Sequence, residues 1–127
     1  MEKIIRINDK EYKLKSSAFT PFAYKNETGR DLMKDISYIY DLYTETNKIE
    51  NEEEKSKKWL DEIMGILDMV LKITHIMIKE ADSNAPSYED WLKGLDNILG
   101  DTTWLLDSLS CGFSPFSGQL QKNQNIQ

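Results

Sequence analysis

The stretch WLDEIMGILDMVLKITHIMIKEA, residues 59–81, decides the expected fold. Its polar residues recur every three or four positions, which places them on one narrow stripe of a helix. They are Asp61, Gly65, Asp68, Lys72, His75 and Lys79. Almost every other position is apolar, and a helix that is apolar over most of its circumference is central, with neighbours on several sides. Either the rest of this chain covers that surface or another protein does.

Two helices are expected before this stretch. Thr20 followed by Pro21 is typical of a helix start, and Gly29 is typical of its end. Asp31 then caps a second helix, whose apolar residues recur at helical spacing to about residues 43–46. The next segment carries many balanced charges, which predicts a solvated loop or a frayed helix start over residues 47–58.

Two helices are expected after the central one. Ser87 caps the first, with acidic residues in its first turn where the helix dipole favours them. The apolar face of this helix is expected to hold Trp91, Leu92, Leu95, Ile98 and Leu99. A last helix is expected over residues 102–109 and carries Trp104, Leu105 and Leu109.

The first segment, KIIRINDKEYKLK (residues 3–15), predicts a β-hairpin, because apolar residues alternate on both arms and Asn8-Asp9 tolerates positive φ. Two strands alone are marginal and must pack on helices. The expected fold is therefore mainly α (α+β), with the N-terminal hairpin packed on a bundle of about four to five helices. From residue 111 the sequence is polar and without period, so we expect one domain over 1–110 and a flexible tail over 111–127.

Composition and charge restrict the classes of partner. The 127 residues suit one domain, and 22 acidic against 16 basic side chains give a net charge of -6. Such a surface repels a phosphate backbone, which disfavours a nucleic-acid partner. The apolar stretch is interrupted by charges, so no membrane span is expected, and the N-terminus lacks the pattern of a secretory signal. The protein is therefore expected in the cytoplasm. One Cys and one His can form neither an internal disulfide nor a thiol-rich metal centre, so no metal or cofactor is expected.

The residues that could carry catalysis lack suitable neighbours. His75 has no acidic residue three or four positions away, and we expect an exposed helical histidine there and not a base. Cys111 has no evident basic partner that would make it a nucleophile. Arg30 adjoins a single glycine, too few for a phosphate cradle, so it is expected to face solvent or to pair two helices. A non-catalytic binding or assembly module is therefore favoured over an enzyme.

A binding module of this kind would hold a partner's helix in an apolar groove. Flexible Met side chains tolerate varied partners, and the expected lining is Trp59, Ile63, Ile66, Met69, Ile73 and Met77. The alternative is that these residues are the core of the domain itself. Phe113 and Phe116 bracket Pro115 in a polar segment, and they either dock on a partner or fold back onto the domain.

The order of four segments resembles the tail assembly chaperones of long-tailed phages and of related prophages of low-GC Gram-positive bacteria. The segments are the IIRINDKEYKLK hairpin, the block FTPFAYKNETGRDLMKDI, the AD…PSYEDWL segment after the apolar helix, and the WLL helix near the end. Together they span most of residues 3–109.

The resemblance implies a small, mainly helical, non-catalytic protein of the host-cell cytoplasm. It would coat the aggregation-prone tape-measure protein until tail-tube subunits polymerise around it, and would be absent from the finished virion. The family often also has a longer frameshifted form, which a polar end over 118–127 would suit. Self-association through the same surface stays open. The alternative function is a small prophage or host regulatory protein that inhibits a partner by surface binding.

Overall fold

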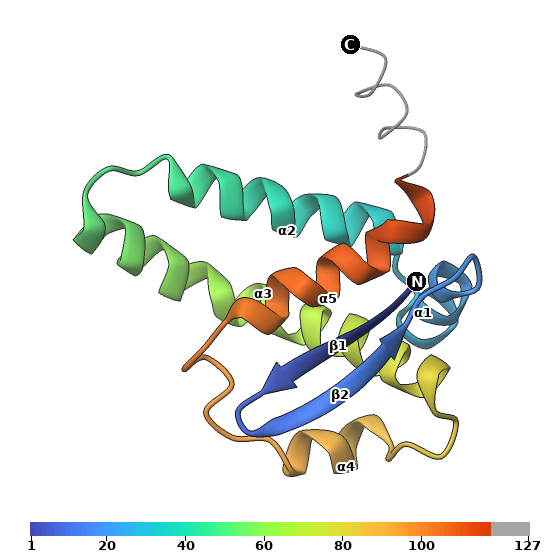
Figure 1. Ribbon diagram of the computed structural model, residues 1–127. Helices are drawn as coiled ribbons and strands as arrows, with labels where there is room; N and C mark the ends of the chain where they lie inside the picture. The colour runs from blue at the N-terminus through green and yellow to red at the C-terminus, as the bar shows by residue number, and fades with distance from the viewer. Residues whose placement is uncertain (118–127) are drawn as a thin grey trace.

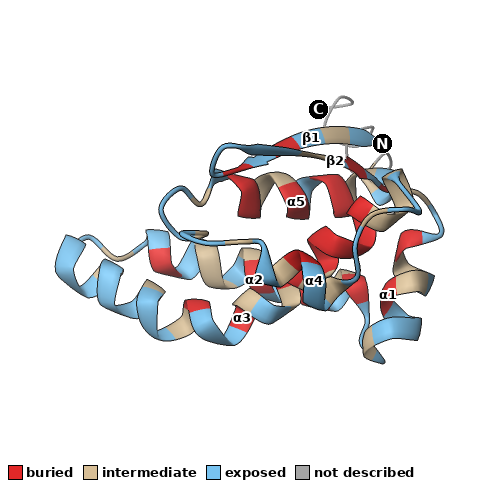
Figure 2. Ribbon diagram, turned by 90° about the horizontal axis from the view of Figure 1, so that it is seen from below, coloured by how far each residue is buried: buried red, intermediate tan, exposed pale blue. Residues whose placement is uncertain are grey.

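The structure is a computed structural model that describes residues 1–117. It is mainly helical with an N-terminal two-stranded hairpin, so the predicted fold class is confirmed (Figure 1). The elements in chain order are β1 (Glu2–Ile7), β2 (Lys10–Lys15), α1 (Thr20–Thr28), α2 (Leu32–Asn47), α3 (Glu52–Ala81), α4 (Tyr88–Lys93), α5 (Thr103–Phe113) and a 3₁₀ turn, Ser114–Phe116. Seen in layers, the hairpin covers α5, and α5 covers the antiparallel pair α2 and α3 (Figure 2).

Helix α3 is the central element, since it contacts β2, α5, α1 and α2. Eight of the nine residues from Val70 to Ile78 in its second half are buried, and the ninth, Lys72, is half-buried. The helix starts at Glu52, seven residues before Trp59, because the Asn51 side chain accepts a hydrogen bond from the Glu54 amide at 3.0 Å. The sequence predicted either a solvated loop or a frayed helix start over residues 47–58. Residues 52–58 form the first turns of α3, so for most of the segment the second alternative holds.

The hairpin pairs Ile5 with Tyr12 and Ile7 with Lys10 in antiparallel register. Its turn contains Asn8 at φ 56°, a conformation that asparagine tolerates. Ile5, Ile7 and Leu14 are buried on the helix side, while the intervening residues face solvent. This alternation gives the sheet one face to pack on α3 and α5.

Capping hydrogen bonds define the end of α1 and the starts of α2 and α4. In α1, Pro21 occupies the first turn, and the helix ends at Gly29 with φ 73°, where the glycine amide donates to the Lys25 carbonyl. The Asp31 carboxylate accepts from the Lys34 amide at 3.0 Å and starts α2. The Ser87 hydroxyl accepts from the Asp90 amide and starts α4. The indoles of Trp91 in α4 and Trp104 in α5 are both buried.

The helix predicted after Ser87 is shorter than expected. It ends at Lys93, so Leu95, Ile98 and Leu99 lie in an irregular segment and not on a helical face. In this irregular segment Asn97 has φ 45°, a left-handed conformation that breaks a helix. The Trp104 indole N–H donates to the Ile98 carbonyl at 2.9 Å, and the Asn8 side chain in the hairpin turn donates to the Asp96 carbonyl, which ties the segment to α5 and to the hairpin.

The boundary predicted at residue 111 is wrong, because α5 continues to Phe113. Cys111 and Gly112 are buried, and the Ser16 hydroxyl donates to the Cys111 carbonyl at 2.6 Å. A Cβ on Gly112 would lie 3.3 Å from the Ile36 side chain, so the small residue allows α5 to approach α2 closely. The remainder of the predicted flexible tail, residues 118–127, lies outside the described residues.

The prediction of an exposed His75 is also wrong. The side chain is 4% exposed, and its Nε2 donates to the Pro86 carbonyl at 2.8 Å. Its ring lies between those of Tyr88 and Trp91, with 5.5 Å between ring centroids in each case. The segment before and within α4 folds back along the polar stripe of α3, where Lys79 donates to two of its carbonyls. The C-terminal half of the polar stripe is therefore covered by another segment of the same chain.

Arg30 takes the second of its expected roles and pairs two helices. Its guanidinium donates from Nε and from a terminal nitrogen to the Asp35 carboxylate, both at 2.8 Å. The Tyr24 hydroxyl donates to the same carboxylate, which joins α1 to α2. Asp35 is 5% exposed; burial alone would raise its pKa, but the hydrogen bonds from Arg30 and Tyr24 hold the pKa of this carboxyl below its usual value.

We predict that Arg30→Ala lowers the free energy of unfolding by about 1–2 kcal/mol, because it leaves a buried carboxylate with one donor in place of three. The chain still folds, since Tyr24 keeps its bond. Arg6→Ala is the matched control, because Arg6 pairs with Glu11 on the exposed hairpin surface and its loss changes stability by about 0.5 kcal/mol or less. Urea unfolding of both variants measures the difference, and equal stabilities would contradict the role of Arg30.

We predict that Gly112→Val destabilises the protein by about 1–3 kcal/mol, since its methyl groups enter space held by Ile36 and Ile73. Gly65→Val is the control, because a Cβ at Gly65 of α3 meets no atom within 4 Å. Valine there is expected to change stability by about 0.5 kcal/mol or less. Thermal unfolding compares the two variants; an unchanged melting temperature for Gly112→Val would mean that α5 does not pack as described.

Candidate protein-binding site

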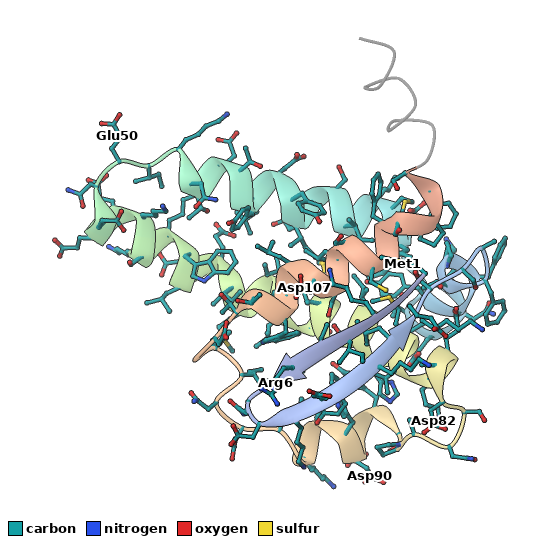
Figure 3. The ribbon with its side chains drawn as sticks, in the orientation of Figure 1. Met1, Arg6, Glu50, Asp82, Asp90 and Asp107 are labelled. Atoms are coloured by element: carbon teal, nitrogen blue, oxygen red, sulfur yellow. The ribbon has the colours of Figure 1, made fainter. Side chains whose placement is uncertain are left out.

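Helices α2 and α3 extend beyond the rest of the protein as a two-helix arm, defined here as residues 42–62. In Figure 1 the arm projects past α5 and the hairpin, and Glu50, labelled in Figure 3, stands at its tip. Most of its residues are exposed (Figure 2). Few neighbours cover this end of α3, in contrast with the fully surrounded second half.

A hollow of about 280 Å³ lies where the arm meets α5. Its lining is mostly apolar and includes Ile39, Tyr43, Trp59, Ile66, Leu106 and Leu109. A second hollow of about 220 Å³ continues along the arm and shares Tyr43, Trp59 and Thr102 with the first. We call these two hollows together the arm groove.

Aromatic packing shapes the arm groove. The rings of Tyr43 and Trp59 meet edge to face, with centroids 6.5 Å apart, and they bridge α2 and α3. Toward the tip, the lining becomes polar and includes Glu52 and Lys55. The groove therefore offers apolar surface near α5 and both signs of charge at its outer end, which suits one face of an amphipathic segment.

An exposed apolar stripe lies on another side of α3. Leu60 and Met64 are 62% and 69% exposed, and they share a helix face because they stand four residues apart. The same line continues through half-buried Leu67 to buried Leu71. We call Leu60, Met64 and Leu67 the α3 stripe. Two large exposed apolar side chains on one helix turn form a contiguous patch of the kind that marks a partner surface.

The residues predicted to line a partner groove are mostly interior. Ile63, Ile66, Ile73 and Met77 are buried in the domain, and Met69 is half-buried. Only Trp59 and Ile66 of the predicted set line the arm groove. For most of the set the structure therefore favours the alternative, that these residues are the core.

The stripe residues Leu60 and Met64 were not among the predicted ones. The sequence placed them on the apolar circumference of the helix, but local periodicity carries no signal of which apolar positions are left uncovered. Only the absence of a neighbouring element along this side of the arm exposes them.

The two aromatic residues near the end of the described chain behave differently from each other. Phe113 is half-buried and packs against the core, where it lines a hollow of about 390 Å³ with Met33 and Tyr40 of α2. Phe116 is 39% exposed in the 3₁₀ turn. Phe113 thus folds back onto the domain, while Phe116 leaves part of its ring in solvent.

The reactive side chains have these environments. Cys111 is buried with its Sγ 3.6 Å from the Ser16 hydroxyl, and burial raises the pKa of this thiol. Within residues 1–117, no group of three or more His, Cys, Asp or Glu side chains could hold a metal ion. In the same part of the chain, no helix has the length and apolar content needed to cross a membrane.

Comparisons with protein-family models, with curated proteins and with solved structures found no match for this chain. The arm groove and the α3 stripe are therefore the features on which a function can be argued.

We predict that the arm opens more readily than the body of the protein. Backbone amides of residues 55–61 should exchange hydrogen faster than those of residues 70–78 in the same helix, because the first set is largely exposed and the second is enclosed. Hydrogen-exchange mass spectrometry of the whole chain measures both segments at once. Equal protection along α3 would contradict this description of the arm.

Proposed function

We propose that this protein is a non-catalytic chaperone that binds apolar helical segments of a larger partner through its two-helix arm. The observation that carries the proposal is the α3 stripe, with Leu60 and Met64 exposed on the same helix whose Trp59 and Ile66 line the arm groove. One residue step turns a helix by about 100°. The stripe at Leu60 therefore lies about a quarter turn around α3 from the groove face at Trp59, and a client would have to follow the surface of α3 to contact both.

The expected strength of this contact suits a temporary cover. Burying two side chains such as Leu60 and Met64 stabilises a complex by on the order of 3–6 kcal/mol before the cost of association is subtracted. Contacts in the arm groove add to this. Because the cost of association is of similar size, Leu60 and Met64 alone do not hold a client and the groove contacts are also needed; the modest net binding energy then allows a competing polymer to displace the chaperone.

The client that we propose is the tape-measure protein of a long-tailed phage or prophage. This part of the proposal rests on the resemblance of four segments to tail assembly chaperones. A tape-measure protein has long apolar helical stripes that aggregate when uncovered, and an arm with an apolar groove and an apolar stripe could cover them in turn. The tail-tube protein would then displace the chaperone, which acts in the host cytoplasm.

The test is co-expression with the protein encoded directly downstream. We expect this chain to raise the soluble fraction of that protein and to purify in complex with it. The double variant Leu60→Asp with Met64→Asp should lose most of the complex, because each change places a charge on the contact surface. Ile4→Asp is the control, since Ile4 is equally exposed but lies on the hairpin, away from the arm.

Two outcomes would contradict different parts of the proposal. If the downstream protein is equally insoluble with and without this chain, the tape-measure client is wrong, and capture of another, regulatory target would favour the alternative function. If the Leu60 and Met64 variant works as well as the wild type, the α3 stripe is not the contact. Thermal unfolding of each variant separates lost binding from lost folding.

A further inference from the structure

A second cleft, of about 470 Å³, lies between α1, the second half of α3 and the start of α4. We call it the α1 cleft. Its apolar walls are Phe19, Ala23, Ile76 and the ring of Tyr88, and its acidic residues are Glu27 and Glu80. It shares no lining residue with the arm groove, so what it binds does not depend on the proposed chaperone function.

Two buried acceptor atoms on residues that line this cleft have no hydrogen-bond donor. The first is Nδ1 of His75. Because a carbonyl oxygen only accepts, His75 Nε2 must carry the proton that it shares with Pro86, and Nδ1 of the neutral ring is an acceptor. The second is Oε2 of Glu80, whose other oxygen accepts from the Thr20 hydroxyl at 2.9 Å. Since buried acceptors without partners are costly, a donor bound here is favoured.

The charges around the α1 cleft favour a cation. Glu27 and Glu80 are both in its lining. The one basic residue of that lining, Lys79, directs its ammonium group to the carbonyls of Ser83 and Ala85, at 3.1 and 2.8 Å. The ammonium is thus held by the loop before α4, and the two carboxylates stay without a basic partner among the ion pairs of the described chain.

The shape and the rim of the cleft favour one kind of cation. Apolar walls suit the aliphatic stem of a long side chain, and an aromatic ring suits a planar guanidinium, which is less strongly hydrated than an ammonium and has donors for two acceptors. Phe19, which lines the cleft, is 60% exposed. An apolar residue beside the bound side chain would cover this ring.

We propose that the α1 cleft binds an arginine side chain of a partner polypeptide. The guanidinium donates to Glu80 Oε2 and to His75 Nδ1, its stem lies between Ala23 and Ile76, and Tyr88 forms one wall. Glu27 adds attraction at the entrance. The partner segment therefore combines a basic residue with apolar neighbours.

The test is a titration of the isotope-labelled full chain with N-acetyl-arginine methylamide, followed by NMR. We expect saturable shifts of the Ala23 and Ile76 methyl signals. The citrulline analogue has the same shape without the charge, and should bind at least about tenfold more weakly, as loss of a charge-assisted hydrogen bond predicts. The lysine analogue should also bind more weakly.

Variants locate the site. Glu80→Gln replaces the unpartnered carboxylate oxygen and keeps an acceptor for Thr20, and it should weaken arginine binding by about tenfold. Glu89→Gln is the control, because Glu89 is exposed and pairs with Lys93 on α4. Absence of saturable shifts, equal binding of citrulline, tighter binding of lysine or full binding by a folded Glu80→Gln protein would each overturn the proposal.

Discussion

The structure depends on the need to enclose the second half of α3. From Val70 to Ile78 every residue of this helix except Lys72 is buried, and no single neighbour can cover a helix completely. The chain meets the requirement with different elements on different sides: the hairpin and α5 on one, α1 and α2 on others, and the α4 segment along the polar stripe. Two contacts hold the enclosing helices in place. Helix α5 packs closely on α2 at Gly112, and the hydrogen bonds to Asp35 connect α1 with α2.

The same constraint explains why the arm exists. A domain of this size has few elements, and those that surround residues 70–78 leave none to cover residues 52–64 beyond α2. The first half of α3 nevertheless keeps apolar residues such as Leu60 and Met64, which gain nothing from exposure in the isolated chain. Apolar side chains that the fold does not use are available for a partner, and this is the physical basis of the proposed chaperone function.

The α4 segment, which covers the polar stripe of α3, also determines which hydrogen bonds His75 can form. Because the α4 segment places Tyr88 and Trp91 on His75, the imidazole is fixed by one hydrogen bond and its other nitrogen is enclosed without a donor. Glu80 is similar, with one oxygen bound by Thr20. Packing that satisfies the helix thus leaves two acceptors beside an open cleft, and such a site is suited to a cationic group.

Features that depend on neighbouring residues in the chain could be predicted from sequence alone. The hairpin turn at Asn8, the cap at Asp31 and the helical period through residues 59–81 are local, because φ and ψ preferences and side chain to backbone hydrogen bonds act over a few residues. Whether a given apolar or polar position is covered depends on elements distant in sequence. Sequence reasoning therefore placed His75 in solvent, ended the domain before Cys111 and overlooked Leu60 and Met64. Only the tertiary structure decided these points, because burial is set by which surfaces of the chain meet.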